Sequence, residues 1–165
     1  MENLQTVTWK ADPITGEFVI YEGEQPVGFF RRNWLGYKAK AEWKGKNYRM
    51  TFPSWSGLKM KIVEEETAEE IAFASFNLMS TKANVRLFDG SHMQWKYNNY
   101  SQNKWQISDE QDQRIEFKES WNRGKVLHQD EEASSLQMMI GLMLHQYLWN
   151  MRVFVAATSL LIFVV

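Results

Sequence analysis

The amino-acid sequence predicts a mainly β protein: a closed barrel of about twelve antiparallel strands, in three four-stranded repeats, around a C-terminal apolar α-helix. Three observations support this prediction. Short segments that alternate apolar and polar residues follow one another from about residue 4 to residue 129. A similar phrase recurs among them at a fixed spacing. The final stretch, residues 135–165, is apolar with Arg152 as its single formal charge.

The strands are predicted from period-2 alternation bounded by Gly, Asp, Asn and Pro. Gly23, Gly45 and Gly90 stand in polar turns between such segments, which is typical of antiparallel hairpins. The expected strands are residues 5–9, 17–21, 26–31, 37–43, 47–52, 58–63, 70–76, 83–88, 92–97, 104–108, 114–118 and 125–128.

The repeat consists of an acidic turn, then Val or Ile, one further residue and Phe. Its three copies are spaced 44 residues apart at Val27, Ile71 and Ile115, and again at Phe29, Phe73 and Phe117. Self-similarity at a fixed period is the signature of repeated supersecondary units. Three copies of a four-stranded unit predict the twelve strands.

A helix is predicted over residues 134–165 because Leu, Met, Ala and Gln dominate its first half and no proline interrupts it. Acidic residues precede it and suit the positive end of a helix dipole. The part up to Met151 is about 24 Å long, close to the height of about 15 to 20 Å that tilted strands enclose. The residues expected to fill the barrel are Leu136, Ile140, Met143, Leu144, Tyr147, Leu148 and Met151.

The final apolar segment, from Val153 to Val165, is about 20 Å long as a helix, too short alone for a hydrocarbon core of about 30 Å. A longer span that includes Arg152 has the length but places a charge near the bilayer centre, at a cost of about 2.5 to 3.5 kcal/mol. A membrane anchor, an extension of the helix and a surface for self-association therefore all remain open for this segment.

Composition predicts one domain over residues 1–165, with 44% hydrophobic residues to fill a core. The chain has no cysteine, and its three histidines lie far apart in sequence, so we expect no metal site and no cofactor. No catalytic motif is visible, and we expect no enzyme. A net charge of −1 gives no reason to expect nucleic-acid binding. The N-terminal residues do not resemble a secretory signal, and a cytoplasmic location is expected.

Charge is unevenly distributed along the sequence, with an excess of Lys and Arg over residues 10–61 and an excess of Asp and Glu over residues 62–135. Basic side chains in the first of these segments alternate with apolar ones, so they are expected to project outward from their strands. A cluster of them would attract anionic lipid headgroups, although a solvated strand face is the commoner role. The candidate headgroup ligands are Arg31, Arg32, Lys38, Lys40, Lys59 and Lys61.

The predicted architecture, with phrases such as YEGEQPVGFFRR, NYRMTFPSW and LMLHQYLWNMR, resembles the tubby-like superfold. This group includes tubby carboxy-terminal domains, phospholipid scramblases and plant LURP-one-related proteins. The resemblance covers the chain from Leu4 to about Met151. It implies a barrel around a central helix and, from tubby domains, a basic surface that binds phosphoinositides. The scramblases' cysteine-rich segment and calcium site have no counterpart in this sequence.

Two functions are expected from these features. The first is a non-enzymatic tubby-like barrel at or near a membrane surface, peripheral or anchored by its C-terminus, that binds anionic lipid headgroups. The second is a soluble interaction module in which residues 153–165 mediate self-association or contact a partner. A small-ligand carrier would need an internal cavity, which the helix is expected to fill.

Overall fold

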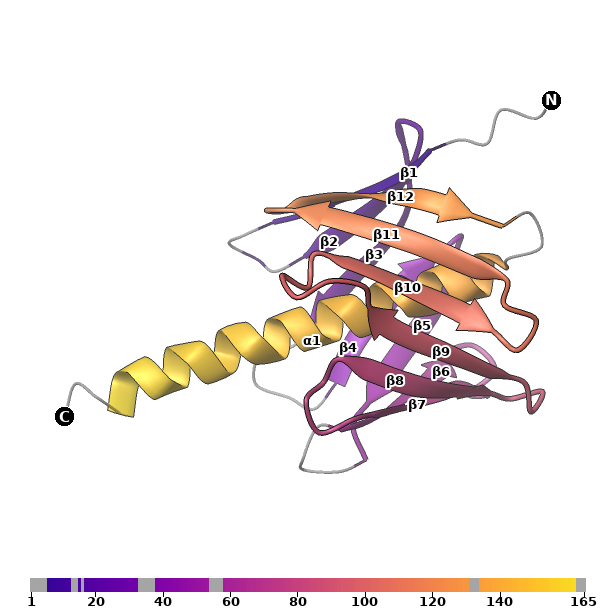
Figure 1. Ribbon diagram of the computed structural model, residues 1–165. Coiled ribbons are helices and arrows are strands. Elements are labelled where there is room, and N and C mark those ends of the chain that lie inside the picture. The colour runs from indigo at the N-terminus through magenta and orange to yellow at the C-terminus, as the bar shows by residue number, and fades with distance from the viewer. Residues whose placement is uncertain are drawn as a thin grey trace.

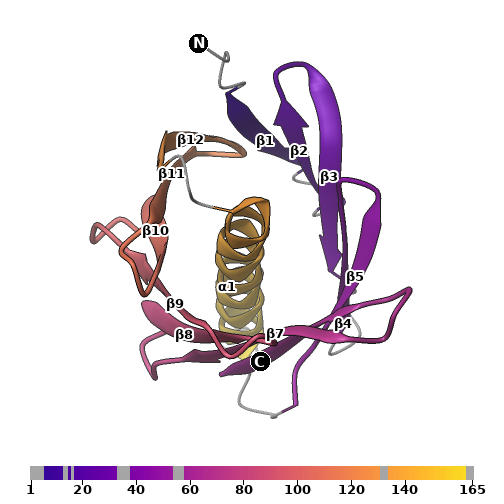
Figure 2. The same ribbon diagram turned by 90° about the vertical axis from the view of Figure 1, so that its right-hand side faces the viewer.

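A computed structural model confirms the predicted fold class: twelve antiparallel strands form a closed barrel around one C-terminal helix. The structure describes residues 6–12, 15, 17–32, 38–53, 58–130 and 134–162, with the backbone alone for Arg32 and residues 150–162. Figure 2 shows the strands surrounding the helix on all sides. Among the described residues, no helix is both long enough and apolar enough to cross a membrane.

The strands follow one another around the barrel in chain order, and β1 pairs with β12 to close it. Their bounds are β1 Val7–Ala11, β2 Phe18–Glu22, β3 Gln25–Arg32, β4 Lys38–Trp43, β5 Lys46–Thr51, β6 Lys59–Glu64, β7 Glu70–Phe76, β8 Lys82–Leu87, β9 His92–Tyr97, β10 Lys104–Asp109, β11 Arg114–Ser120 and β12 Arg123–Gln129. All twelve predicted strands are present, with ends that differ by up to two residues.

Tight turns join several of the strands as predicted. Gly23, Gly45 and Gly90 have φ values of 61°, 79° and 86°, a left-handed conformation that glycine adopts without a steric penalty. Lys44 precedes Gly45 with φ 48°, so both central residues of this turn are left-handed, as in the two-residue hairpin turns that match strand twist. These turns set the register of the neighbouring strands.

The repeat falls on every fourth strand, since its three copies lie on β3, β7 and β11. The copies do not face the same way. Phe29 and Phe73 are half-buried on the outer face, whereas Phe117 is fully buried inside the barrel. A constant spacing in sequence selects the strand, but the residues in each turn and bulge decide which face a position occupies.

Helix α1, Ser135–Ile162, runs through the barrel and projects from one end of it (Figure 1). Trp43 donates a 2.8 Å hydrogen bond from Nε1 to Oγ of Ser135, and the backbone N–H of Gln137 donates to Oγ of Ser134 at 3.0 Å. These bonds fix the first turn of the helix. Residues 163–165, which were predicted to be helical, lie outside the described residues.

The core is the space between α1 and the inward side chains of the strands. Ile140, Met143, Leu144, Tyr147 and Leu148 are buried there, and Leu136 is half-buried at the start of the helix. The side chain of Met151 lies outside the described residues. Tyr147 stacks on Phe52 with ring centroids 4.5 Å apart, and Trp149 is already 47% exposed. The helix therefore leaves the barrel near residue 149.

Candidate functional site

The two ends of the barrel are chemically different, and they are named here by the helix. The exit end is the end from which α1 projects, and the start end is the end at which α1 begins (Figure 1). In this up-and-down barrel, the odd-numbered strands run toward the exit end and the even-numbered strands run away from it. Residues late in odd strands and early in even strands therefore lie together at the exit end.

Four of the six basic residues predicted as headgroup ligands lie at the exit end: Arg31 and Arg32 end β3, Lys38 begins β4 and Lys59 begins β6. Lys40 and Lys61 lie midway along β4 and β6, within reach of start-end carboxylates. Arg31, Lys38, Lys40 and Lys59 are exposed on the outer face, and Lys61 is half-buried. For Arg32 the backbone alone places it, next to Arg31 at the end of β3. The sequence analysis therefore selected four residues that the fold brings to one side of the exit end, and two that lie farther along the barrel wall.

Three of these cations are already engaged by carboxylates. Arg31 lies 2.6 Å from Glu17, Lys61 lies 2.6 Å from Glu70 and Lys40 lies 3.6 Å from Glu65. Such exposed pairs contribute about 0 to 1 kcal/mol each. They can therefore exchange for another anion at little cost. Lys38 and Lys59 have no carboxylate partner within the part of the chain that the structure describes.

Further basic residues complete this end of the barrel on the strands that the sequence analysis did not select. They are Lys10 on β1, Lys82 on β8, Lys96 on β9, Lys104 on β10, Lys118 on β11, and Arg123 and Lys125 on β12. Acidic residues that the structure describes at the exit end are Asp12, Glu17 and the buried Glu119. The exit end is therefore strongly basic.

The start end is acidic. Its described acidic residues are Glu22, Glu24, Glu42, Glu64, Glu65, Glu66, Glu69, Glu70, Asp89, Asp109, Glu110, Asp112 and Asp130. Lys44, Lys46, Arg86 and Arg114 also lie there. Three of them pair with carboxylates: Lys44 with Glu22 at 2.6 Å, Lys46 with Glu64 at 2.8 Å and Arg114 with Glu116 at 3.8 Å. The near-zero net charge thus conceals a separation of charge along the barrel axis.

Exposed apolar and aromatic side chains gather at the exit end as well. Leu78 and Met79 in the β7–β8 turn are 89% and 79% exposed. Tyr100 in the β9–β10 turn and Trp121 in the β11–β12 turn are almost fully exposed. With Trp149 on α1, these residues form apolar tips around the projecting helix. Large apolar side chains exposed together commonly mark an interaction surface.

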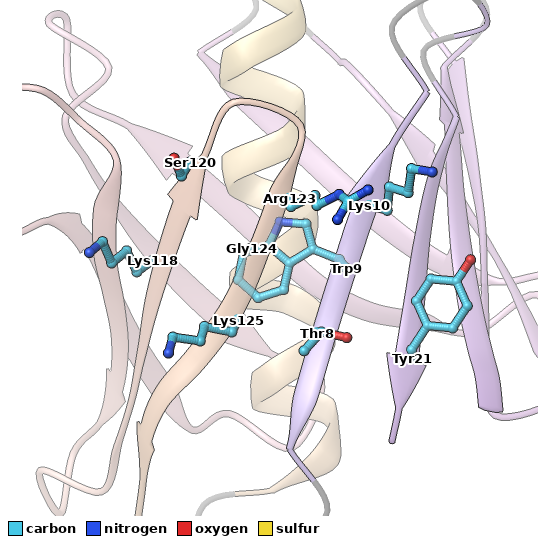
Figure 3. Close-up of a pocket in the computed structure, with 9 residues that line it drawn as sticks. All are labelled: Thr8, Trp9, Lys10, Tyr21, Lys118, Ser120, Arg123, Gly124 and Lys125. Carbon is cyan, nitrogen blue, oxygen red and sulfur yellow. The ribbon is translucent and has the colours of Figure 1, made fainter. Parts of the chain in front are cut away.

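A pocket of about 520 Å³ opens on the barrel wall near the exit end, where β1 meets β12 (Figure 3). We call it the seam pocket. Its lining residues are Thr8, Trp9, Lys10, Tyr21, Lys118, Ser120, Arg123, Gly124 and Lys125. The seam joins the two ends of the sheet through three residue pairs, among them Trp9 with Gly124.

A chain of polar groups lies behind the seam pocket, inside the barrel. Trp9 donates a 3.0 Å hydrogen bond from Nε1 to Oε2 of the buried Glu119. The same carboxylate oxygen lies 3.3 Å from Nε2 of His145, without the geometry of a hydrogen bond. Nδ1 of His145 is 3.2 Å from the hydroxyl of Tyr97, and its ring stacks on Trp105. Polar groups thus connect the pocket floor to the central helix.

Within the described ranges, no three His, Asp or Glu side chains are grouped so that they could hold a metal ion. Comparisons with protein-family models, with curated proteins and with solved structures find no match. The tubby-like resemblance therefore stays a prediction.

The residues that the sequence analysis missed share a detectable signal. The sign of the charge changes between turns, being acidic at Glu22 and Glu24, basic from Arg31 to Lys40 and acidic again after Glu64, although the intervening turn at Lys44 and Lys46 is basic. Charge totals over residues 10–61 and 62–135 do not show this pattern, because each range contains turns from both ends of the barrel. In an up-and-down barrel this pattern places opposite charges at opposite ends. The seam pocket had no such signal, because its lining comes from both ends of the sheet.

Proposed function

We propose that this protein is a non-enzymatic barrel that docks onto an anionic membrane surface through its exit end. One observation carries the proposal: basic side chains, exposed aromatic and apolar tips, and the projecting part of α1 occur together at the same end. On this proposal the protein is a peripheral membrane protein that contacts lipid headgroups at the exit end, with the start end facing water.

Electrostatics favour this orientation over the reverse. A basic residue near the surface of an anionic membrane contributes about 1 kcal/mol. Lys38, Lys59 and Lys104 can contribute without breaking an ion pair, since none of them pairs with a carboxylate of the described chain. The acidic start end is repelled by the same surface. The axial separation of charge therefore orients the barrel before contact.

The apolar tips and the helix add the contacts that charge alone does not provide. Tryptophan and tyrosine favour the interface between headgroups and hydrocarbon, where an amphipathic ring suits both environments. Residues 150–162 continue α1 beyond the barrel for about 20 Å, compared with about 15 Å for the hydrocarbon of one leaflet. We propose that this apolar segment enters the near leaflet, with Arg152 at headgroup level.

Vesicle flotation of the full-length chain tests the proposal. We expect the protein to float with vesicles that contain phosphatidylglycerol and to float much less with neutral phosphatidylcholine vesicles. High salt should weaken flotation to the extent that binding depends on surface charges and not on insertion of the helix, because screening reduces the contribution of those charges. Equal flotation with both vesicle types, or flotation with neither, would contradict docking through the basic end.

Charge variants with a matched control make the test specific. The exit variant changes Lys38, Lys59 and Lys104 to Gln, and the control changes Arg86 and Arg114 with Lys44 to Gln at the start-end side of the barrel. Both variants lose three positive charges. We expect the exit variant to bind anionic vesicles about 100-fold less tightly, from about 1 kcal/mol per residue, and the control to bind nearly as the parent does.

Self-association is the second candidate function, and the same projecting helix favours it. Residues 153–165 are apolar in sequence, and the part up to Ile162 continues α1 away from the barrel. A second copy could cover this segment. Analytical ultracentrifugation of the full chain and of a chain that ends after Arg152 separates the alternatives. A concentration-dependent dimer that the truncation abolishes, without vesicle binding, favours an interaction module.

A further inference from the structure

The seam pocket is a second basic feature, and it differs from the exit end as a whole because it is a cavity with a defined lining. The cations that line it come from three neighbouring strands, β1, β11 and β12. Among the described residues, no carboxylate lines it. Lys10, Lys118, Arg123 and Lys125 are exposed, and none of them forms an ion pair with a described residue. Four positive charges therefore surround a cavity to which the described chain contributes no counter-charge.

The register of the strands places these cations in direct opposition. Lys10 pairs with Arg123 across β1 and β12, and Lys118 pairs with Lys125 across β11 and β12. Like charges that face each other across strands are destabilising. An anion in the pocket, within reach of all four cations, would relieve the repulsion within both pairs.

The floor of the pocket is rigid and closely fitted. A Cβ at Gly124 would lie 2.1 Å from the indole of Trp9, so only glycine leaves room for the ring at this position (Figure 3). The ring is held from inside by its hydrogen bond to Glu119 and by packing against Phe18 and Trp105. The floor thus offers an aromatic edge rather than a hydrogen-bond donor.

Hydroxyl groups complete the lining. Thr8 and Ser120 lie on β1 and at the end of β11, and the phenol of Tyr21 borders the cavity from β2 (Figure 3). Hydroxyls donate to phosphate oxygens, and an aromatic ring can cover a small organic group. The volume of about 520 Å³ falls within the range of small-molecule sites.

We propose that the seam pocket binds the phosphomonoester group of a small ligand. A phosphomonoester carries close to two negative charges near neutral pH, against one for a phosphodiester, and four cations favour the dianion. The group can belong to a soluble metabolite or to a lipid headgroup. The pocket is distinct from the apolar tips, so this proposal goes beyond membrane docking and does not depend on it.

Calorimetric titration of the full-length chain with glycerol 3-phosphate tests the soluble source, with glycerophosphocholine, a phosphodiester, as the comparison. Flotation with phosphatidic acid vesicles tests the lipid source, with phosphatidylglycerol vesicles as the comparison. A preference for the monoester in either arm supports the proposal and identifies the source. The absence of that preference in both arms overturns it, and docking through the exit end would still stand if both vesicle types bound equally.

Variants assign the effect to the pocket. Lys118→Gln with Lys125→Gln should weaken monoester binding at least about tenfold, because charge-assisted hydrogen bonds are lost. Lys38→Gln with Lys59→Gln removes the same charge from the opposite wall and should change the affinity for soluble glycerol 3-phosphate less than about twofold, and should leave the preference for phosphatidic acid over phosphatidylglycerol unchanged. Equal losses in the two double variants would overturn the proposal. Lys10→Gln with Arg123→Gln is the second pocket variant, and unchanged far-ultraviolet circular dichroism confirms that each variant folds.

Discussion

Replacing Gly124 with alanine should destabilise the protein by closing the space that the indole of Trp9 occupies. The added Cβ would lie 2.1 Å from Cε2 and Cζ2 of that ring and 2.5 Å from its Nε1. The ring cannot move farther into the core, because Phe18 and Trp105 pack against it with centroids 5.9 and 5.6 Å away. Since the φ of Gly124 is not left-handed, the effect of alanine is steric and not a matter of backbone strain.

The expected destabilisation follows from three contributions. Overpacking costs about 1 to 3 kcal/mol, and a displaced ring loses its hydrogen bond to the buried Glu119, worth about 1.5 to 3 kcal/mol. The lower entropy of the unfolded chain with alanine returns about 0.4 to 1 kcal/mol. A net loss of about 3 kcal/mol should lower the urea midpoint by about 1.5 M, for an m-value of about 2 kcal/mol/M.

Equilibrium urea unfolding, followed by circular dichroism, measures this change. The exposed Ser120→Ala variant in the same hairpin should change stability by less than about 0.5 kcal/mol and serves as the control. A double-mutant cycle supplies the decisive comparison, because Gly124→Ala should cost little when Trp9 is already leucine. The steric reasoning is refuted if alanine at position 124 is tolerated, or if its cost is the same in both backgrounds.

Three other predictions concern the core and the start of the helix. Tyr147→Ala should lower the free energy of unfolding, measured in urea, by about 3 to 5 kcal/mol, because it removes a buried stacked ring. A loss below about 1 kcal/mol would contradict the role of Tyr147 in filling the barrel. Trp43→Phe should cost about 1 kcal/mol by the same measurement, because Ser135 loses its indole donor, and a Ser135→Ala background should remove most of that cost. The backbone N–H of Arg114 donates a hydrogen bond to the Asp130 carboxylate and lowers the pKa of Asp130. The ionised Asp130 therefore stabilises the fold above the ordinary carboxyl pKa, and this contribution is lost as pH falls through the lower pKa of the folded protein. Asp130→Asn should therefore flatten the dependence of the thermal midpoint on pH below about 4, and an unchanged acid limb would contradict this assignment.

Membrane docking and binding in the seam pocket depend on different residues and can be tested separately. Docking depends on the summed charge and the apolar tips of the exit end, so it should respond to salt and to any sufficiently large loss of charge there. The pocket depends on four named cations in fixed register. Variants on the wall of β4 and β6 should therefore affect the first property, and those on β11 and β12 should affect the selectivity of the second.

The sequence by itself determined the local structure of this protein. Alternation of polar and apolar residues along β9, the glycines Gly23, Gly45 and Gly90, and an uninterrupted apolar helix specify a strand, hairpins and a helix that must be enclosed. These features depend on neighbours in sequence, and so they could be predicted within a residue or two. The six basic candidates were found because alternation indicates which side chains face outward.

Only the tertiary structure decided how distant segments combine. The repeat selects β3, β7 and β11, yet Phe117 faces inward where Phe29 faces outward, because turns and bulges reset the alternation. The seam pocket exists because closure brings Lys10 of the first strand beside Arg123 of the last, a proximity that no local pattern encodes. Charge is likewise sorted to the two ends by strand direction, so the barrel converts an alternation along the chain into a separation in space.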